Sequence, residues 1–284
     1  MGSPARPVTG LPRALTIAGS DSGGGAGIQA DLKTFFALGC HGMSAITALT
    51  AQNTVAVTGV VEVDPGFVVE QVEAIATDIG IDAAKTGMLA SAPLVEAVAK
   101  AVEAFDVRRL VVDPVSVSKH GDRLLAEDAV DALRTVLLPL AEVVTPNLHE
   151  AATLADAGAI ETMDAMKEAA LAIHALGPRT VLVKGGHFGD GDESVDLVYD
   201  GKAFSELRGP RFDTRDTHGT GCALSAAVAA RLAHGDSTTD ALNEAKRFIS
   251  GAIERSLRIG NGYGPVNPGW ELATTASASA VRPA

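Results

Sequence analysis

The alternation of short apolar runs with longer amphipathic stretches limits the fold of this chain more than any other feature. Aliphatic and β-branched runs predict strands at residues 14–18, 46–51, 110–112, 143–145 and 180–183. Between them, apolar residues recur at helical spacing, which predicts helices over residues 92–105, 128–138, 163–176 and 239–257. Strands and helices in alternation favour an α/β fold with a largely parallel sheet that is covered on both faces.

One pair of runs near the C-terminal end departs from this pattern. Residues 195–199 and 203–207 flank Asp200-Gly201-Lys202, a sequence typical of a hairpin turn. The strands of a hairpin are antiparallel, so we expect a mixed sheet that is mostly parallel.

The domain organisation follows from where these patterns begin and end. Residues 1–12 are rich in proline and glycine and predict a flexible N-terminal segment, and residues 272–284 lack apolar periodicity and predict a disordered tail. We find neither a linker nor a repeat between them. Residues 13–271 are therefore expected to form a single domain.

Composition narrows the partners and the compartment. The 23 Lys and Arg against 35 Asp and Glu give a formal charge of −12, which repels polyanions, and only 4% of residues are aromatic. Nucleic acid and anionic membranes are therefore not expected as partners. Two cysteines are too few for a disulfide framework, and we find no apolar leader and no run long enough to cross a bilayer. We expect a cytoplasmic protein.

Polar residues and glycines follow most of the predicted strands. Open α/β sheets bind ligands beyond the carboxyl ends of their strands, so these residues are expected to meet at one edge. An alternative is that they only form turns, which favour Gly, Pro, Asn and Asp. The segments concerned are residues 19–21, 52–53, 85–88, 113–114, 146–147 and 184–186.

The first such segment opens a glycine-rich turn over residues 19–27, before a helix predicted at residues 28–38. Its glycines allow close approach of a ligand, but their spacing fits neither a Walker A loop nor a dinucleotide fingerprint. Asp31 lies beside the apolar stripe of this helix, so it is expected to need a polar partner. The alternative is a solvated carboxylate at a helix start.

The strongest local signal is Thr217-His-Gly-Thr-Gly-Cys222, which precedes a helix predicted at residues 223–233. Gly219 and Gly221 leave backbone amides open at the helix start, which predicts a site for a phosphoryl group. Cys222 would lie at the positive end of the helix, where a thiolate is favoured. Its alternative role is that of a small buried apolar residue.

Further residues suit a nucleotide with a bound metal ion. Asn147 and Glu150, three apart at a helix start, and Asp113 offer oxygen ligands for Mg²⁺. Lys184 ends a strand and can place a charge on a phosphate. A helix cap formed by Asn147 and Glu150 and a surface position for Lys184 are the alternatives. We find neither zinc-ligand spacing nor a Gly-x-Ser-x-Gly elbow.

Taken together, the motifs closely resemble hydroxymethylpyrimidine/phosphomethylpyrimidine kinases of thiamine biosynthesis, within the ribokinase-like superfamily. The resemblance spans nearly the whole predicted domain. The segments that carry it are residues 14–21, 24–35, 46–54, 87–89, 113–115, 121–122, 145–151, 184–187 and 217–222.

This resemblance implies a ribokinase-like three-layer α/β/α sandwich with a central, mostly parallel sheet. It also implies phosphorylation, by ATP and Mg²⁺, of the hydroxymethyl group of 4-amino-5-hydroxymethyl-2-methylpyrimidine and then of its monophosphate. Oligomeric state is likewise inferred by resemblance, which favours a homodimer.

The resemblance also implies roles for single residues. Asp31 and Gln52 would hydrogen-bond the aminopyrimidine, and Gly19 and Met88 would line its pocket. Cys222 would act as general base or only position the hydroxyl. The remaining implied roles are stabilisation of the transferring phosphoryl group by the amides of Gly219, Thr220, Gly221 and Cys222, ATP binding by Asn147, Lys184 and Thr217, and metal binding by Asp113 and Glu150.

Three departures from the family pattern fall outside these residues. Gly23 replaces a serine, Thr86 replaces a bulkier aliphatic residue, and residues 115–120, which would belong to a mobile flap, differ from the common sequence. The nearest competing function is a pyridoxal or pyridoxine kinase. A nucleotide-dependent oxidoreductase and a non-catalytic binding module are more distant alternatives.

Overall fold

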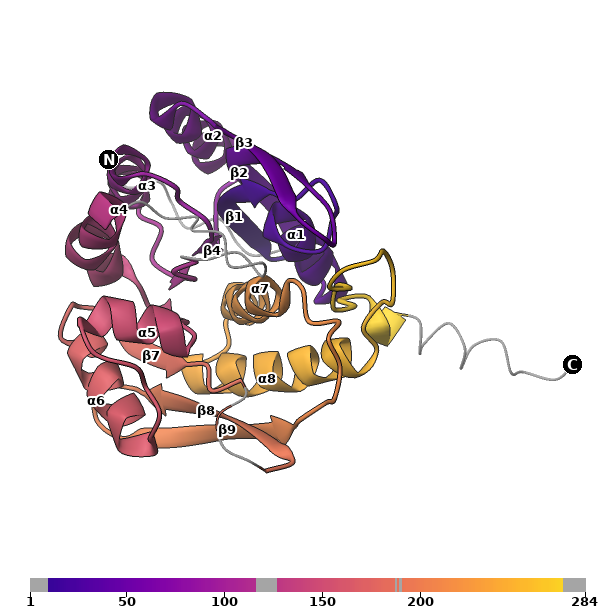
Figure 1. The fold of residues 1–284 in the computed structure, drawn as a ribbon. Helices are drawn as coiled ribbons and strands as arrows, with labels where there is room; N and C mark the ends of the chain where they lie inside the picture. Colours follow the sequence, from indigo (N-terminus) through magenta and orange to yellow (C-terminus); the bar gives the residue numbers. More distant parts are fainter. Residues whose placement is uncertain (1–9, 116–126, 187, 189–190, 273–284) are drawn as a thin grey trace, which may run out of the picture.

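A nine-stranded mixed sheet runs through the structure, in the order β3-β2-β1-β4-β5-β6-β7-β8-β9 (Figure 1). This computed structural model describes residues 10–115, 127–186, 188 and 191–272. The strands are β1 (Arg13–Ser20), β2 (His41–Gln52), β3 (Val57–Glu62), β4 (Ala83–Thr86), β5 (Leu110–Val112), β6 (Val143–Val144), β7 (Thr180–Val183), β8 (Glu193–Tyr199) and β9 (Phe204–Pro210).

The strands from β2 through β1 and β4 to β7 pair in parallel, and β3, β8 and β9 pair antiparallel with their neighbours. The expected mixed, mostly parallel sheet is therefore confirmed, and so is the hairpin, whose turn contains Gly201 at a φ of +86°. The antiparallel edge strand β3 was not predicted; five of its six residues are exposed, so it lacks the apolar run that marked the central strands.

Helices cover both faces of the sheet. One apolar core packs α2 to α6 against one face, and a second packs α1, α7 and α8 against the other, which completes the three layers. Val111 belongs to the second core and its neighbour Val112 to the first, as expected for a strand buried on both sides. The helices are α1 (Gly27–Ala37), α2 (Pro65–Asp78), α3 (Ala92–Ala104), α4 (Glu127–Ala132), α5 (Leu148–Ala155), α6 (Met163–His174), α7 (Thr220–Ala233) and α8 (Thr238–Glu254).

Local sequence explains where several helices begin and end. Asp64 caps α2 by accepting hydrogen bonds from the amides of Gly66 and Phe67. The helix expected at residues 128–138 is instead α4 followed by a π-helix (Leu133–Leu137) and a 3₁₀ turn (Leu138–Leu140). Pro139 lies in that turn and has no N–H with which an α-helix could continue through it.

The chain order of the strands locates the ligand-binding edge. β1 pairs with β2 on one side and with β4 on the other, so the connections leave in opposite directions at β1. Such a switch point opens a crevice at the carboxyl ends of the strands. The register of β1 against β2 shifts between Ala18 and Ser20, so Gly19 lies at an irregularity just where β1 reaches this edge.

Some predictions concern residues that the structure does not describe. Most of the predicted N-terminal segment and tail lies in residues 1–9 and 273–284, and most of the predicted flap lies in residues 116–126. Of the helices that the structure describes, none is long and apolar enough to cross a membrane.

Candidate active site

A cavity of about 670 Å³ opens along the carboxyl ends of the parallel strands. Because it extends from β1 and β2 to β7, β8 and α8, residues from both ends of the chain contribute to one wall. Among the predicted site residues, those that line it are Gly19, Gln52, Met88, Asp113, Asn147, Glu150, Lys184, Thr217, Gly219, Thr220, Gly221 and Cys222.

The end of the cavity at β1, β2 and β4, here called the acceptor end, contains Gly19, Gln52 and Met88. A Cβ atom at Gly19 would lie 2.6 Å from Cε of Met88, so glycine is required for the methionine to occupy this place. The Gln52 amide oxygen accepts a hydrogen bond from Oγ1 of Thr50 at 3.1 Å. Gln52 is therefore held beside the space that a ring would fill.

Asp31 is the predicted site residue that does not line the cavity. Its carboxylate is fully buried, accepts a 2.6 Å hydrogen bond from Oγ1 of Thr16, and forms an ion pair with Nζ of Lys85 at 3.0 Å. In this structure the carboxylate is held by Thr16 and Lys85, and its contact with the aminopyrimidine, which the resemblance implies, stays a prediction. The expectation that its carboxylate needs a polar partner is confirmed, and the partner is Lys85 from β4.

The turn before α7, for which the sequence predicts an anion site, is shaped by its glycines. Gly219 caps the helix at a φ of +79°, and a Cβ atom there would lie 1.8 Å from the carbonyl oxygen of Gly25. The helix therefore starts against the first glycine-rich turn, where only glycine fits. Oγ1 of Thr220 donates a 2.8 Å hydrogen bond to the carbonyl of Thr217, which closes the turn.

Asp21 and His218 join the two glycine-rich turns, and sequence reasoning missed this pair. Nε2 of His218 lies 2.9 Å from the Asp21 carboxylate, which also accepts hydrogen bonds from the amides of Gly23, Gly25 and Ala26. Burial alone raises the pKa of Asp21, but the hydrogen bonds from His218 and these amides outweigh it and lower the pKa. Asp21 is thus an ionised anchor for both turns. It is separated from His218 by 197 positions in the sequence, so no local signal indicated the contact.

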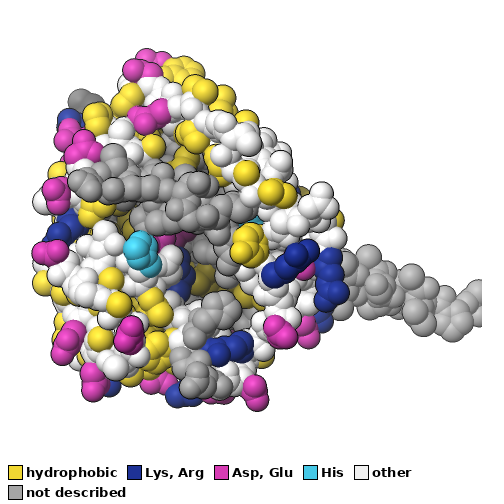
Figure 2. Space-filling view, viewed as in Figure 1, with side chains coloured by type: hydrophobic (Ala, Val, Ile, Leu, Met, Phe, Trp, Pro, Cys, Tyr) yellow, Lys and Arg dark blue, Asp and Glu magenta, His cyan; other side chains and the backbone are white. Residues whose placement is uncertain are grey.

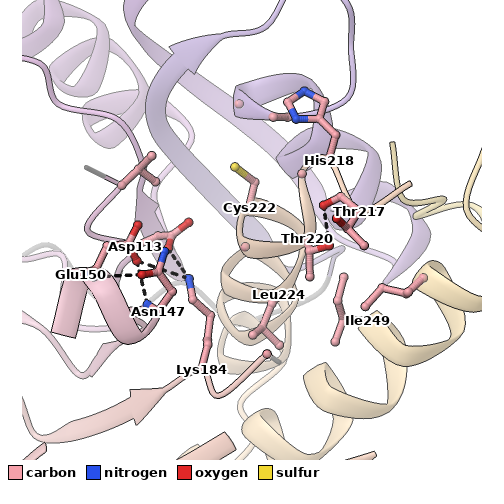
Figure 3. Close-up of a pocket in the computed structure, with 18 of the residues that line it drawn as sticks. Asp113, Asn147, Glu150, Lys184, Thr217, His218, Thr220, Cys222, Leu224 and Ile249 are labelled. Atoms are coloured by element: carbon pink, nitrogen blue, oxygen red, sulfur yellow. Dashed lines mark hydrogen bonds and ion pairs between the residues drawn. The ribbon is translucent and has the colours of Figure 1, made fainter. Parts of the chain in front are cut away.

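Cys222 lies in the first turn of α7, with its side chain at the cavity wall (Figure 3). Burial raises the pKa of its thiol to about 11, although the nearby Lys85 ammonium opposes the shift. The predicted thiolate is therefore wrong for this structure, because loss of water around the sulfur outweighs the favourable end of the helix. Cys222 is a neutral thiol at neutral pH.

The opposite end of the cavity, here called the nucleotide end, gathers charged groups around Lys184. Nζ of Lys184 lies 3.1 Å from Asp113 and 3.9 Å from Glu150, and Figure 3 shows these side chains on one side of α7 with Asn147 beside them. Burial lowers the pKa of Lys184, but the two carboxylates outweigh burial and the net effect raises the pKa, so the group is an ammonium ion. For Asp113 the signs are reversed: burial raises the pKa, whereas Lys184 and Lys85 bring it below its usual range.

Asn147 and Glu150 also form the capping box that their spacing predicts. The Asn147 side chain accepts a hydrogen bond from the Glu150 amide at 2.9 Å, and the Glu150 carboxylate accepts one from the Asn147 amide at 2.8 Å. Both residues also line the cavity, so the helix cap does not prevent them from facing a ligand.

Two further lysines line the cavity without having been assigned a role from the sequence. Lys85 pairs with Asp31, as described above. Lys246 of α8 forms a 2.8 Å ion pair with Asp196 of β8 and donates to Oγ of Ser194 at 3.2 Å. Each partner is distant along the chain, so no spacing rule could have found either pair.

The structure combines a three-layer fold with a cavity in which a cluster of basic and acidic side chains lies beside a glycine-rich helix start. Together these features define a ribokinase-like small-molecule kinase. Comparison with known proteins identifies the branch. The model of a family described as phosphomethylpyrimidine kinase matches residues 21–267. Hydroxymethylpyrimidine/phosphomethylpyrimidine kinase from Streptomyces coelicolor is 53% identical over 272 residues, 96% of this chain and 99% of that relative. The chain belongs to the hydroxymethylpyrimidine/phosphomethylpyrimidine kinase family, as its motifs predicted.

Solved structures agree with this assignment. Pyridoxal kinase from Bacillus subtilis in complex with ADP has a TM-score of 0.86 and 40% identity, covering 93% of this chain and 99% of that one. Phosphomethylpyrimidine kinase from Clostridium difficile has a TM-score of 0.75 and 41% identity, covering 85% and 99%. The ribokinase-like fold and a phosphotransferase that uses ATP are confirmed, and the oxidoreductase alternative is excluded.

Proposed function

We propose that this chain transfers the γ-phosphoryl group of ATP to the hydroxymethyl group of 4-amino-5-hydroxymethyl-2-methylpyrimidine and then phosphorylates the monophosphate, as a step of thiamine biosynthesis. The observation that carries this proposal is a single cavity with the acceptor end and the nucleotide end on either side of the turn at residues 219–222. An acceptor oxygen beside Cys222 and a phosphate beside Lys184 would then meet at the backbone amides of that turn.

Gly19, Gln52 and Met88 form the acceptor part of the proposal. Gln52 would hydrogen-bond the aminopyrimidine through its amide, and Met88 would pack on the ring. Thr217, Asn147 and Lys184 all line the cavity. In this proposal they bind ATP, and the ammonium of Lys184 would meet the phosphates. The amides of Gly219, Thr220, Gly221 and Cys222 would stabilise charge on the transferring group.

Mg²⁺ fits the carboxylates of the nucleotide end. The two acidic side chains that line the cavity there are Asp113 and Glu150, and Mg²⁺ is commonly held by one or two carboxylates with phosphates and water. Over the part of the chain that the structure describes, no three His, Cys, Asp or Glu side chains form a metal cage, so phosphate and water would complete the coordination. The bound ion would offset charge on the phosphate oxygens.

Cys222 positions the acceptor hydroxyl in this proposal and does not act as a ready base. A thiol with a pKa of about 11 is protonated at neutral pH, and phosphoryl transfer through a loose transition state needs little proton abstraction before the bond to phosphorus forms.

The net charge of −12 repels an anionic substrate at long range, so binding at this site depends on local groups. On the face drawn in Figure 2, acidic side chains are spread mainly around the periphery. Binding of ATP is attributed to local groups, namely Lys184 and the amides of the helix start.

The decisive experiment incubates the purified protein with ATP, Mg²⁺ and the pyrimidine alcohol and resolves the products by ion-exchange chromatography. Monophosphate followed by diphosphate is expected, and folded protein that forms neither would refute the proposal. Pyridoxal is the second candidate acceptor, because of the likeness to pyridoxal kinase. Competing the two alcohols and comparing kcat/KM separates the candidates. The homodimer and the cytoplasmic location stay predictions.

A further inference from the structure

The ion pair between Asp31 and Lys85 is the most deeply enclosed charged contact at the cavity. Nζ of Lys85 lies 3.1 Å from Oδ1 and 3.0 Å from Oδ2 of Asp31, and Oγ1 of Thr16 donates to Oδ2 at 2.6 Å. Both charged side chains are 0% exposed. Asp31 comes from α1 and Lys85 from β4, so the pair joins a helix to the centre of the sheet.

Stability does not account for such a pair. Removing two charges from water costs several kcal/mol per ion, and well-packed apolar residues in place of a buried ion pair are often as stable or more so. A sealed pair next to an active site is therefore better explained by what one of its charges does there.

Only one member of the pair reaches the cavity. Lys85 is among the lining residues and Asp31 is not. Nζ of Lys85 would lie 3.0 Å from a Cβ atom at Gly87, and Gly87 lines the acceptor end beside Met88. The ammonium group therefore lies in the wall of the acceptor end, next to Gly87 and without exposed surface, and its counterion Asp31 does not line the cavity.

The charges around Lys85 keep it ionised. Burial lowers its pKa, but attraction to the Asp31 and Asp113 carboxylates opposes burial, and the net effect raises the pKa. The same charged groups also act on Cys222. Lys85 favours negative charge on the sulfur, whereas Asp31 and Asp113 oppose it. Lys184 also interacts electrostatically with Cys222.

We propose that Asp31 is a positioning residue that fixes the Lys85 ammonium at the acceptor end, where this cation stabilises the negative charge that develops on the acceptor oxygen during transfer. The proposal rests on the proposed kinase function. In this proposal Asp31 does not contact the pyrimidine ring; it acts on the acceptor oxygen indirectly, through Lys85.

With Lys85 in this role, the transfer forms one bond to phosphorus and breaks another. The acceptor oxygen bonds to the γ-phosphorus of ATP and its proton is released to solvent. The bond from that phosphorus to the β,γ-bridging oxygen breaks, and ADP leaves with the electron pair. Lys85 neither gives nor takes a proton; its charge acts where negative charge accumulates.

Steady-state kinetics of Asp31→Asn and Lys85→Met test the proposal. For Lys85→Met we expect kcat to fall about 100-fold, the size of losing one charge-stabilising donor. For Asp31→Asn we expect kcat to fall about 10-fold while the KM for the pyrimidine changes less than about threefold, because binding of the ring is unaffected. A KM raised about 10-fold or more at unchanged kcat in Asp31→Asn would overturn the proposal, since it would indicate direct ring binding.

A second measurement is independent of catalysis. The rate of Cys222 alkylation by iodoacetamide, followed by peptide mass spectrometry as a function of pH without substrates, reports the charge balance at the acceptor end. Asp31→Asn should move the alkylation midpoint to lower pH, and Lys85→Met should move it to higher pH. Opposite signs are not expected from a general loss of structure.

Two further variants keep the test interpretable. The double variant Asp31→Asn/Lys85→Met removes both charges, so it should fold even where Lys85→Met leaves a buried carboxylate unpaired, and its midpoint should lie between those of the single variants. Lys246→Met is the matched control: it breaks the Lys246–Asp196 ion pair between α8 and β8 and should leave the Cys222 midpoint unchanged.

The two measurements separate failure of this inference from failure of the kinase function. Opposite shifts of the Cys222 midpoint in a protein that does not phosphorylate the pyrimidine would support the electrostatic role and refute the function. Equal shifts, or none, in an active enzyme would refute the inference alone.

Discussion

Of the three lysines that line the cavity, Lys85 and Lys184 differ most in how far the protein encloses them. Lys85 is 0% exposed and is held by Asp31 behind the wall, whereas the Lys184 side chain is 14% exposed and lies between Asp113 and Glu150 at the surface of the cavity. A lysine at an open wall can exchange a carboxylate partner for an incoming phosphate, but a sealed lysine cannot. In the proposed function, Lys184 would therefore bind phosphate and Lys85 would supply a fixed electric field.

Loss of the open lysine should have the largest effect. For Lys184→Met we expect kcat/KM for ATP to fall about 1000-fold, because the phosphates lose their point charge and two carboxylates remain without their cation. Steady-state kinetics with varied ATP measure this. Lys202→Met, at the exposed turn between β8 and β9, is the control and should match the wild type. A Lys184→Met enzyme with normal kcat/KM would remove the contrast between the two lysines.

Cys222 interacts electrostatically with both lysines, so its titration sharpens the comparison next. Because burial raises the pKa of the thiol to about 11, the protonated form predominates up to about pH 9. A positioning thiol predicts a kcat that is flat between about pH 7 and about pH 9, whereas a thiolate base predicts a rise of about tenfold per pH unit.

Substitutions at the same position give the matching result. Cys222→Ser keeps a group that can hold the hydroxyl and should lose about 10-fold in kcat, whereas Cys222→Ala should lose about 100-fold. A kcat that climbs steadily with pH, together with equal losses in the two variants, would instead favour the base.

The two lysines also show how far the sequence could lead. Lys184 was predicted at the site because it directly follows a buried strand of a parallel sheet, and a local rule places such residues at the ligand edge. The same rule grouped residues 85–88, but it could not show that Lys85 turns back towards Asp31, 54 residues away. Pairing between distant side chains depends on how α1 packs against the sheet, which no local pattern states.

Burial explains the other differences. The helix start favours a thiolate at Cys222 in isolation, but the surrounding protein removes water from the sulfur, and desolvation dominates. Asp31 was correctly expected to need a partner, since it borders an apolar stripe. The family resemblance then placed that partner on the ligand, whereas the structure provides it within the protein.

Glycines lie next to both lysines, and replacing each with alanine tests more gently how tightly the two lysines are enclosed. A Cβ atom at Gly87 would lie 2.8 Å from Cβ of Ala18 and 3.0 Å from Nζ of Lys85, in a sealed region without room to adjust. For Gly87→Ala we therefore expect a loss of about 1–3 kcal/mol in the free energy of unfolding, measured by urea denaturation.

Gly221 gives the matched substitution beside the open lysine. Its Cβ atom would lie 3.3 Å from Nζ of Lys184, a flexible side chain that can move by a few tenths of an ångström. Alanine also favours the helix in which residue 221 lies. Gly221→Ala should therefore fold with unchanged or higher stability and raise the KM for ATP. Equal destabilisation by both alanines would mean that Lys184 is as confined as Lys85.

The smallest effect concerns the carboxylates that hold the open lysine. If Glu150 contributes to a Mg²⁺ site, Mg²⁺ with ATP should raise the melting temperature more than ATP alone, by about 3–6 °C for a tenfold gain in affinity. Glu150→Gln keeps the acceptor for the Asn147 amide, and hence the cap of α5, but removes the charge. It should abolish the additional shift and leave the melting temperature without ligand nearly unchanged. Glu161→Gln, at an exposed position, should retain it. A full Mg²⁺-dependent shift in Glu150→Gln would assign Glu150 to the helix cap alone and leave Asp113 as the carboxylate available to the metal.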